Sequence, residues 1–187
     1  MADSSITKMA LANSLKALMQ EKSFHKISIN DICTGCNMNR KSFYYHFKDK
    51  YDLLNWIFDT EFHELALRSS RLETWDLMLS LCYYLYENRK FYRKALAIDG
   101  QNSFHSHLYD ILYEKFYNEL NILFNEDENE TPLDEIQAQF ITDGVMSALE
   151  RWLLSHNNMT ADEFIEKLRS LVTRLIKAIH KKYSNDK

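Results

Sequence analysis

One stretch of this 187-residue chain, residues 28–54, constrains the fold more than any other. Ser28 is a good N-cap residue, and apolar side chains follow it at helical spacing. The helical pattern breaks at residues 35–37, after which Asn39 can cap a second short helix and Asp49 a third. Two short helices joined by a tight turn form a helix-turn-helix, whose second helix lies in the major groove of DNA. The stretch therefore predicts a DNA-binding unit.

The second predicted helix carries side chains that suit contact with DNA. Arg40 and Lys41 are cations, and arginine pairs with guanine through two parallel hydrogen bonds. Asn39 and Ser42 are small side chains that donate and accept hydrogen bonds. We predict that Arg40 and Lys41 contact base edges and that Asn39 and Ser42 make secondary contacts.

The stretch closely resembles the DNA-binding domain of the TetR family of bacterial transcriptional regulators. The matching residues are Ser28-Ile29-x-Asp31-Ile32-Cys33, then Phe43-Tyr44-Tyr45-His46-Phe47-Lys48-Asp49-Lys50, then Leu53-Leu54. The resemblance implies an all-α fold of about nine helices. A three-helix DNA-binding domain would span residues 1–48, and a helical regulatory and dimerisation domain would span residues 49–187. It also implies contacts to phosphates or flanking bases from Ser28, Tyr44, Tyr45, His46 and Lys50.

One position departs from the family pattern, because Asn37 stands where the turn glycine is usual. The position calls for a positive φ, which asparagine tolerates better than most other residues that carry a side chain. We therefore predict that Asn37 adopts a positive φ and that the turn is kept.

Composition agrees with a helical chain, since only 3 glycines and 1 proline interrupt it. No apolar run reaches the roughly 18–20 residues of a membrane span. The first residues lack an export signal, so we expect a cytoplasmic protein without membrane contact. The net charge of −4 is uneven: residues 1–55 hold 8 basic and 5 acidic residues, and the remainder holds 15 and 22. A basic end on an acidic body fits a protein that meets phosphate at one end.

Motifs of enzymes and metal sites are missing from the chain. It has no G-x-S-x-G, no glycine-rich phosphate loop and no H-E-x-x-H. Cys33 and Cys36 form a C-x-x-C, but a zinc site would need a second ligand pair and a thioredoxin-like site a βαβ unit. We predict no catalysis, no cofactor and no bound metal. The two cysteines are interpreted as packing residues, with thiol sensing as the alternative.

The last two predicted helices suggest a homodimer. Gly144 lies inside the first of them, where glycine costs about 1 kcal/mol relative to alanine. Close approach of a second subunit explains it, and the alternative is that it makes room for a side chain of its own subunit. We predict a four-helix bundle between subunits, as the TetR resemblance also implies, and hence a palindromic operator in double-stranded DNA. The predicted dimer residues are Phe140, Gly144, Ala148, Trp152, Leu168, Leu171 and Leu175.

The middle of the chain is rich in aromatic rings, which suit the lining of a pocket in a TetR-like body. Four residues combine ring surface with a polar tip and are the predicted ligand contacts: Tyr83, Tyr86, His107 and Tyr113. Residues 52–58, 91–96 and 99–104 also resemble a Firmicute subgroup of the family that includes the dihydroxyacetone kinase operon regulator. The partner of that regulator is a kinase-like co-activator protein. We therefore predict a repressor released by an unknown small ligand or, alternatively, a regulator or activator controlled by a partner protein.

Overall fold

The computed structural model describes residues 2–68, 74–100, 102–124, 135–155 and 159–184. Within these ranges, the side chains of residues 2–3, 63–68, 74, 119–124 and 175–184 are not described. The described residues form nine α-helices and one short 3-10 helix, with no strand. The N-terminal elements are α1 (Ala2–Glu21), η1 (Phe24–Lys26), α2 (Ile29–Gly35) and α3 (Arg40–His46). The others are α4 (Lys50–Arg68), α5 (Thr74–Glu87), α6 (Arg89–Leu96), α7 (Phe104–Phe124), α8 (Glu135–Leu154) and α9 (Ala161–Ser184).

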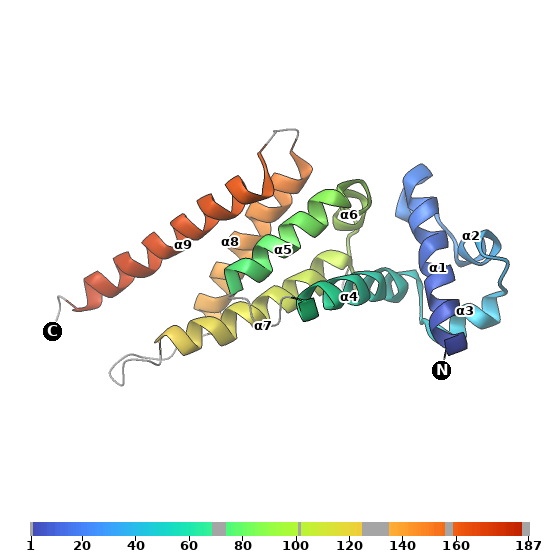
Figure 1. The fold of residues 1–187 in the computed structure, drawn as a ribbon, viewed down its shortest axis with the longest axis horizontal. Helices are drawn as coiled ribbons and strands as arrows, with labels where there is room; N and C mark the ends of the chain where they lie inside the picture. The colour runs from blue at the N-terminus through green and yellow to red at the C-terminus, as the bar shows by residue number, and fades with distance from the viewer. Residues whose placement is uncertain (1, 69–73, 101, 125–134, 156–158, 185–187) are drawn as a thin grey trace.

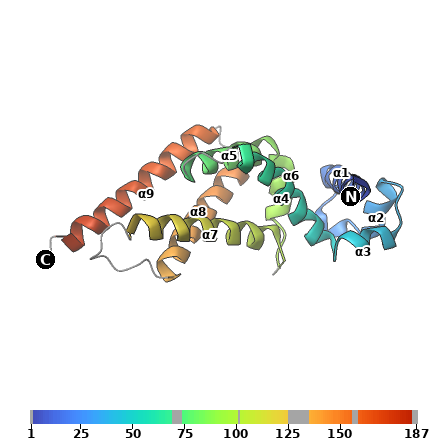
Figure 2. The same ribbon diagram turned by 60° about the horizontal axis from the view of Figure 1, so that its bottom comes forward.

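The molecule is elongated, and different helices form its two ends (Figure 1). Helices α1–α3, here called the reader, form one end, and helices α5–α9, here called the body, form the remainder (Figure 1). Helix α4 leads from the reader into the body, and the far end of α9 lies opposite the reader (Figure 1). The second view shows the same separation, with α6 beside α4 on the side of the body nearer the reader (Figure 2). This arrangement confirms the predicted all-α fold with an N-terminal helix-turn-helix.

The reader is held together by a small apolar core. Its buried members come from all three helices and from the start of α4: Leu11, Leu15, Met19, Ile32, Phe43, Phe47, Leu53 and Leu54. Helices α1 and α2 approach closely where the Ser14 hydroxyl donates a hydrogen bond to the carbonyl of Ile32 at 2.7 Å. A Cβ at Gly35 would lie 2.3 Å from that hydroxyl, so any other residue there would displace the hydroxyl from its hydrogen bond.

The interior between α4, α5, α6 and α7 is lined by aromatic rings. Phe58 of α4 lies at its centre, with ring-centroid distances of 5.1 Å to Phe104 and 5.2 Å to Phe62. The rings of Tyr84 and Tyr92 also contact Phe58, at 6.1 and 6.0 Å. The sequence predicted a ligand pocket among these four helices.

A chain of four polar side chains runs from the reader into these rings and is called the polar chain below. Lys16 of α1 pairs with Glu61 of α4, and the hydroxyl of Tyr84 on α5 donates a hydrogen bond to the same carboxylate. The hydroxyls of Tyr84 and Tyr92, the latter on α6, are hydrogen-bonded to each other. Burial is the main cause that raises the pKa of both tyrosines, so both hydroxyls keep their protons. Four helices are thereby joined through polar groups.

Several helix boundaries follow local signals in the sequence. Asp49 caps α4, its Oδ1 accepting from the amides of Tyr51 at 2.8 Å and Asp52 at 2.9 Å. The sequence predicts a helix over residues 90–98 with Gly100 as its C-terminal cap residue. Helix α6 ends earlier, at Leu96, and Gly100 lies in the turn before α7 with φ of +126°. The sequence also predicts a helix start at residues 131–134, from a threonine cap followed by a proline, and these residues lie outside the described part of the structure. No described helix is long and apolar enough to cross a membrane.

Candidate nucleic-acid interface

Helix α2 begins at a capping box. The Ser28 hydroxyl accepts from the amide of Asp31 at 3.1 Å, and the amide of Ser28 donates to Oδ2 of Asp31 at 2.9 Å. Hydrogen bonds from the backbone and then the side chain of Ser28 lower the pKa of Asp31. The Ser28 hydroxyl also donates to Oδ2 of Asp31, at 2.9 Å. The hydroxyl of Ser28, which was predicted to contact a phosphate, therefore already caps the start of α2.

The turn between α2 and α3 depends on one residue with positive φ. Asn37 has φ of +54°, which confirms the prediction made from the sequence. The amide of Met38 then bonds back to the carbonyl of Cys33 at 2.9 Å. Helix α3 starts two residues later, where Oδ1 of Asn39 accepts from the amide of Ser42 at 2.9 Å. Asn39 is thus the N-cap of α3, and its side-chain oxygen has a structural role.

Helix α3 buries one face and exposes the other. Phe43 is fully buried, and Phe47 directly after the helix is nearly so. On the opposite face, Tyr44 is 50% exposed and Tyr45 is 82% exposed. Exposing two tyrosine rings has a cost in water, and contact with a second surface would remove it. The helix therefore presents a surface suited to a partner.

The predicted base-reading cations lie on this open face. Arg40 and Lys41 are both exposed, in the first turn of α3. Arg40 donates through Nη2 to the hydroxyl of Tyr44 at 3.2 Å, and its guanidinium lies 5.7 Å from the centre of that ring. The tyrosine thus helps to hold the arginine in place. Ser42 and His46 are half-buried at the edges of the same face.

Lys50 differs from its predicted role as a phosphate contact. Its Nζ donates to the carbonyls of Phe24 and Ile27, both at 2.8 Å, and reaches that of His25 at 3.5 Å. The ammonium also lies 4.5 Å from the centre of the Phe24 ring, and burial lowers its pKa. Its donors face the main chain of η1, so we correct its assignment: Lys50 ties η1 to α4 and is no longer counted as a phosphate contact.

The two cysteines of the C-x-x-C are free thiols that pack inside the reader. Cys33 is buried and Cys36 half-buried. Burial is the largest cause that raises the pKa of each thiol. A reactive or metal-binding cysteine needs a thiolate, so the raised pKa favours the packing interpretation over thiol sensing.

The residues predicted for a dimer separate into two groups. Phe140 is 76% exposed on α8 and Gly144 is exposed, whereas Ala148 is half-buried and Trp152 is buried. The stripe turns inward because each step of four residues advances about 40° beyond a full turn, and three steps accumulate about 120°. Trp152 stacks on Phe164 at 4.8 Å, and its Nε1 donates to the carbonyl of Met159 at 2.9 Å. Its assignment to the dimer surface is therefore corrected.

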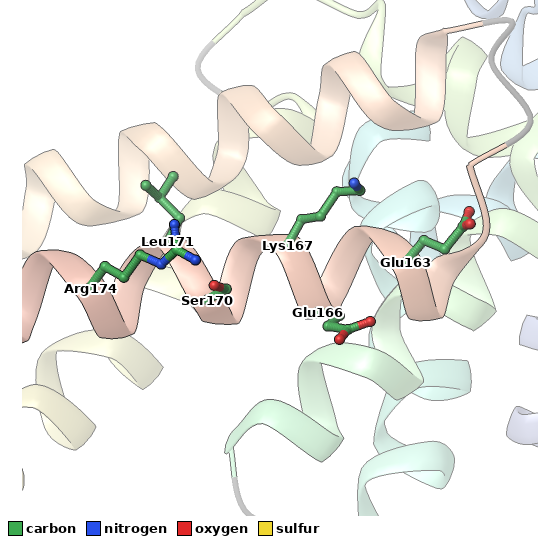
Figure 3. Close-up of a pocket in the computed structure, with 6 residues that line it drawn as sticks. All are labelled: Glu163, Glu166, Lys167, Ser170, Leu171 and Arg174. Carbon is green, nitrogen blue, oxygen red and sulfur yellow. The ribbon is translucent and has the colours of Figure 1, made fainter.

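Helix α9 shows the same division. Leu168 is buried within its own protomer, which corrects its assignment, whereas Leu171 is exposed. The side chain of Leu175 lies outside the described part of the structure. An open concavity of about 570 Å³ follows α9, and Figure 3 shows its lining: Glu163, Glu166, Lys167, Ser170, Leu171 and Arg174. All six described lining residues belong to α9, so the concavity runs along that helix and differs from the predicted pocket among α4–α7.

The four predicted ligand contacts do not share one set of neighbours. Tyr83 is exposed and its hydroxyl donates to Asp162 of α9, while the ring of Tyr86 stacks on that of Trp152. Nε2 of His107 lies 2.6 Å from Oδ1 of Asp59 on α4. Tyr113 stacks between the rings of Tyr109 and Tyr117, its neighbours on α7. Only His107 contacts the central ring of Phe58, so the prediction of a common site among these four gains no support.

Sequence reasoning missed the residues that join the reader to the body. Glu61, Tyr84 and Tyr92 of the polar chain were overlooked as polar partners because they lie on three different helices. Lys94 of α6 was also overlooked. Its Nζ donates to carbonyls at the C-terminal end of α1. No local sequence pattern predicts such contacts between residues that lie far apart in the chain.

Comparison with known proteins gives consistent matches along the chain. The family model described as "Bacterial regulatory proteins, tetR family" matches residues 14–57, and "Transcriptional regulator C-terminal region" matches residues 73–174. The HTH-type dhaKLM operon transcriptional activator DhaS of Lactococcus lactis subsp. lactis (strain IL1403) is 30% identical over 179 residues, which are 95% of this chain and 92% of that protein.

Solved structures show the same relationship. A dihydroxyacetone kinase operon activator DhaS has a TM-score of 0.62 at 26% identity, covering 92% of this chain and 97% of its own. A TetR transcriptional regulator from Streptococcus agalactiae 2603V has a TM-score of 0.65 at 22% identity, covering 91% and 96%. The second of these likenesses concerns the fold alone.

Proposed function

This chain belongs to the TetR family of bacterial transcriptional regulators, and we propose that it acts as a homodimer on an inverted-repeat operator. Like the relatives that it matches, it is a DNA-binding transcriptional regulator and not an enzyme. The observation that carries the proposal is the outer face of α3, where Arg40, Lys41, Tyr44 and Tyr45 are exposed together. A regulator of bacterial genes acts where the chromosome lies, so we place it in the cytoplasm.

The proposed contacts follow from the chemistry of this face. Arg40 stands in the first turn of the recognition helix, the part that reaches base edges in helix-turn-helix proteins. Its guanidinium suits the two acceptors of guanine, and Lys41 beside it suits a base edge or a phosphate. Tyr44, Tyr45 and His46 supply polar tips for phosphates at the margin, with Asn39 and Ser42 at the start of the helix. We also propose that the DNA-binding domain ends at residue 48 and that the regulatory and dimerisation domain begins at residue 49.

The proposed dimer uses the exposed parts of α8 and α9. Ile136 and Phe140 are large apolar residues, each about three-quarters exposed on α8. A Cβ placed on Gly144 would meet nothing within 4 Å, so its own protomer does not require glycine there. Leu171 and the concavity along α9 offer an adjoining surface. An uncovered apolar stripe with a glycine at its centre supports close packing of a second subunit.

Two modes of control remain, each with its own support. The first is a repressor released by a small ligand, for which the polar chain supplies hydroxyl and carboxylate groups among the aromatic rings of the body. The second is an activator controlled by a partner protein. It is supported by likeness to DhaS, named as a transcriptional activator, over 95% of this chain. Transcription in vitro from the adjoining promoter separates them: added regulator lowers the transcript in the first case, and in the second it raises the transcript once the partner protein is also added.

Binding to genomic DNA tests the proposal directly. Fragments that the full-length protein selects should contain an inverted repeat with half-sites about one helical turn apart, or a multiple of it. Arg40→Ala should weaken operator binding by roughly 5- to 150-fold and relax specificity at one base pair.

Arg89→Ala is the matched control. Arg89 on α6 makes the same kind of contact, donating to the hydroxyl of Tyr86 at 3.2 Å, but it lies outside the reader. If both variants bound the operator like wild type, Arg40 would not read bases. If selection returned no inverted repeat, the dimeric mode of binding would be wrong.

A further inference from the structure

Helix α6 belongs to the part of the body nearest the reader, and two adjacent cations on it bind the ends of two other helices. Figure 1 shows α6 at the side of the body that faces α1. Lys94 extends its Nζ to three carbonyls of the reader, those of Met19 at 2.6 Å, Gln20 at 3.1 Å and Lys22 at 3.3 Å. Helix α1 ends at Glu21, so these belong to its last turn and the residue after it.

Arg93 makes the corresponding contact with the body. Its Nε donates to the carbonyl of Leu153 at 2.7 Å, and its Nη2 donates to that of Ser155 at 2.5 Å. Helix α8 ends at Leu154, so Arg93 binds the C-terminal end of the helix that carries the proposed dimer surface. Each C-terminal helix end leaves unpaired carbonyls with a partial negative charge, which a cation satisfies.

Helix α6, which carries both cations, is packed into the body. Four of the eight residues of α6 are buried, and they come from both ends of the helix: Phe91, Tyr92, Ala95 and Leu96. The hydroxyl of Tyr92 is further held by the polar chain. Because its buried residues hold α6 within the body, the three hydrogen bonds of Lys94 hold the end of α1 close to α6.

The position of α1 matters because the recognition helix moves with it. Helices α1, α2 and α3 share one core, in which Leu15, Ile32 and Phe43 are fully buried. A rotation of the reader about its junction with α4 would therefore carry α3 along and would break the three hydrogen bonds of Lys94. In a dimer, such rotations alter the distance between the two recognition helices.

We propose that Lys94 and Arg93 are positioning residues that fix the reader against the dimerisation helix and so select the spacing between operator half-sites. The inference rests on the proposed binding of a homodimer to an inverted repeat. It adds a determinant of specificity that lies outside the reader. Neither residue needs to touch DNA.

A library of operators in which the two half-sites are separated by spacers of different length tests the proposal. Wild type should prefer one spacing, and Lys94→Met should reduce that preference over the neighbouring spacings by about tenfold, because hydrogen bonds to a charged donor are lost. Lys94→Arg restores a cation and should restore the preference. Lys90→Met removes an exposed lysine from the same helix and should leave the preference unchanged. Arg93→Gln removes the second contact and should broaden the preference like Lys94→Met.

A second measurement separates this proposal from the proposed function. Spin labels on Thr34 of α2 and Glu87 of α5, both exposed, report the distance between reader and body without DNA when labelled chains are diluted with unlabelled ones. The distance distribution should widen in Lys94→Met and stay narrow in Lys90→Met. Unchanged distances, or an unchanged spacing preference in a folded Lys94→Met protein, would overturn the positioning role. Failure of wild type to bind any inverted repeat would refute the proposed function while the distances still test the role of Lys94.

Discussion

Removal of the Phe140 ring should dissociate the dimer without unfolding the protomer. The side chain is 76% exposed in the protomer, so it contributes little to the protomer's own core. Full burial of a phenylalanine side chain stabilises by roughly 1.5–3 kcal/mol, and three-quarters of that amount is about 1–2 kcal/mol. A two-fold interface buries both copies, which gives about 2–4 kcal/mol for the dimer. Phe140→Ala should therefore raise the dimer dissociation constant by roughly 30- to 1000-fold.

Sedimentation velocity over a range of protein concentrations measures that constant. The control is Tyr45→Ala, which removes a ring that is 82% exposed on α3 and so tests whether loss of any exposed aromatic residue has the same effect. Tyr45→Ala should leave the dimer intact and weaken operator binding, whereas Phe140→Ala should weaken both. Equal dissociation constants for wild type and Phe140→Ala would refute the placement of the dimer surface on this part of α8.

Three further changes test other parts of the structure. Gly144→Leu should weaken the dimer in sedimentation while the protomer stays helical by circular dichroism, because a Cβ there meets nothing within 4 Å in the protomer; a dimer as tight as wild type would contradict close helix packing. Asn37→Ala should lower the free energy of unfolding by about 1 kcal/mol in urea titrations, because φ is +54°, and Asn37→Gly should not; equal losses would contradict the strain. Burial raises the pKa of Cys82 from 9.0 to about 12 and raises that of Tyr84 as well, so the folded state keeps protons that the unfolded state releases. Stability is then fully present below pH 9 and falls as the pH rises toward 12; thermal unfolding midpoints that stayed constant from pH 8 to 11 would contradict this, and Cys82→Ala should remove the part due to the thiol.

Features that depend on residues three or four apart could be predicted from the sequence. The spacing of Thr160 and Glu163 predicts a capping box at the start of α9. The structure contains it, with the amide of Thr160 donating to Glu163 at 2.9 Å. The caps at Asn39 and Asp49 and the positive φ of Asn37 also follow from such local chemistry. These local signals predicted the helices of the reader, and the resemblance to the TetR family supplied the nine-helix fold.

Features that depend on tertiary position could not be predicted in the same way. Trp152 lies on the same sequence stripe as Phe140, yet the drift of that stripe around α8 carries it into the protomer core. Lys50 matches a phosphate-contacting position by pattern, but its ammonium is held by the main chain around η1, more than 20 residues away. Which cation binds which distant carbonyl is decided by packing between helices, and periodicity does not encode it.

The contact from Lys94 to α1 has a consequence for how such regulators diverge. Its acceptors are main-chain oxygens, which every amino acid supplies. The exposed side chains of Gln20 and Lys22 can therefore change during evolution without loss of the contact. The outward residues of α3 are equally unconstrained by it. A duplicated gene can acquire a new operator while it inherits the junction between reader and body unchanged, so the recognition helix and the body can evolve separately.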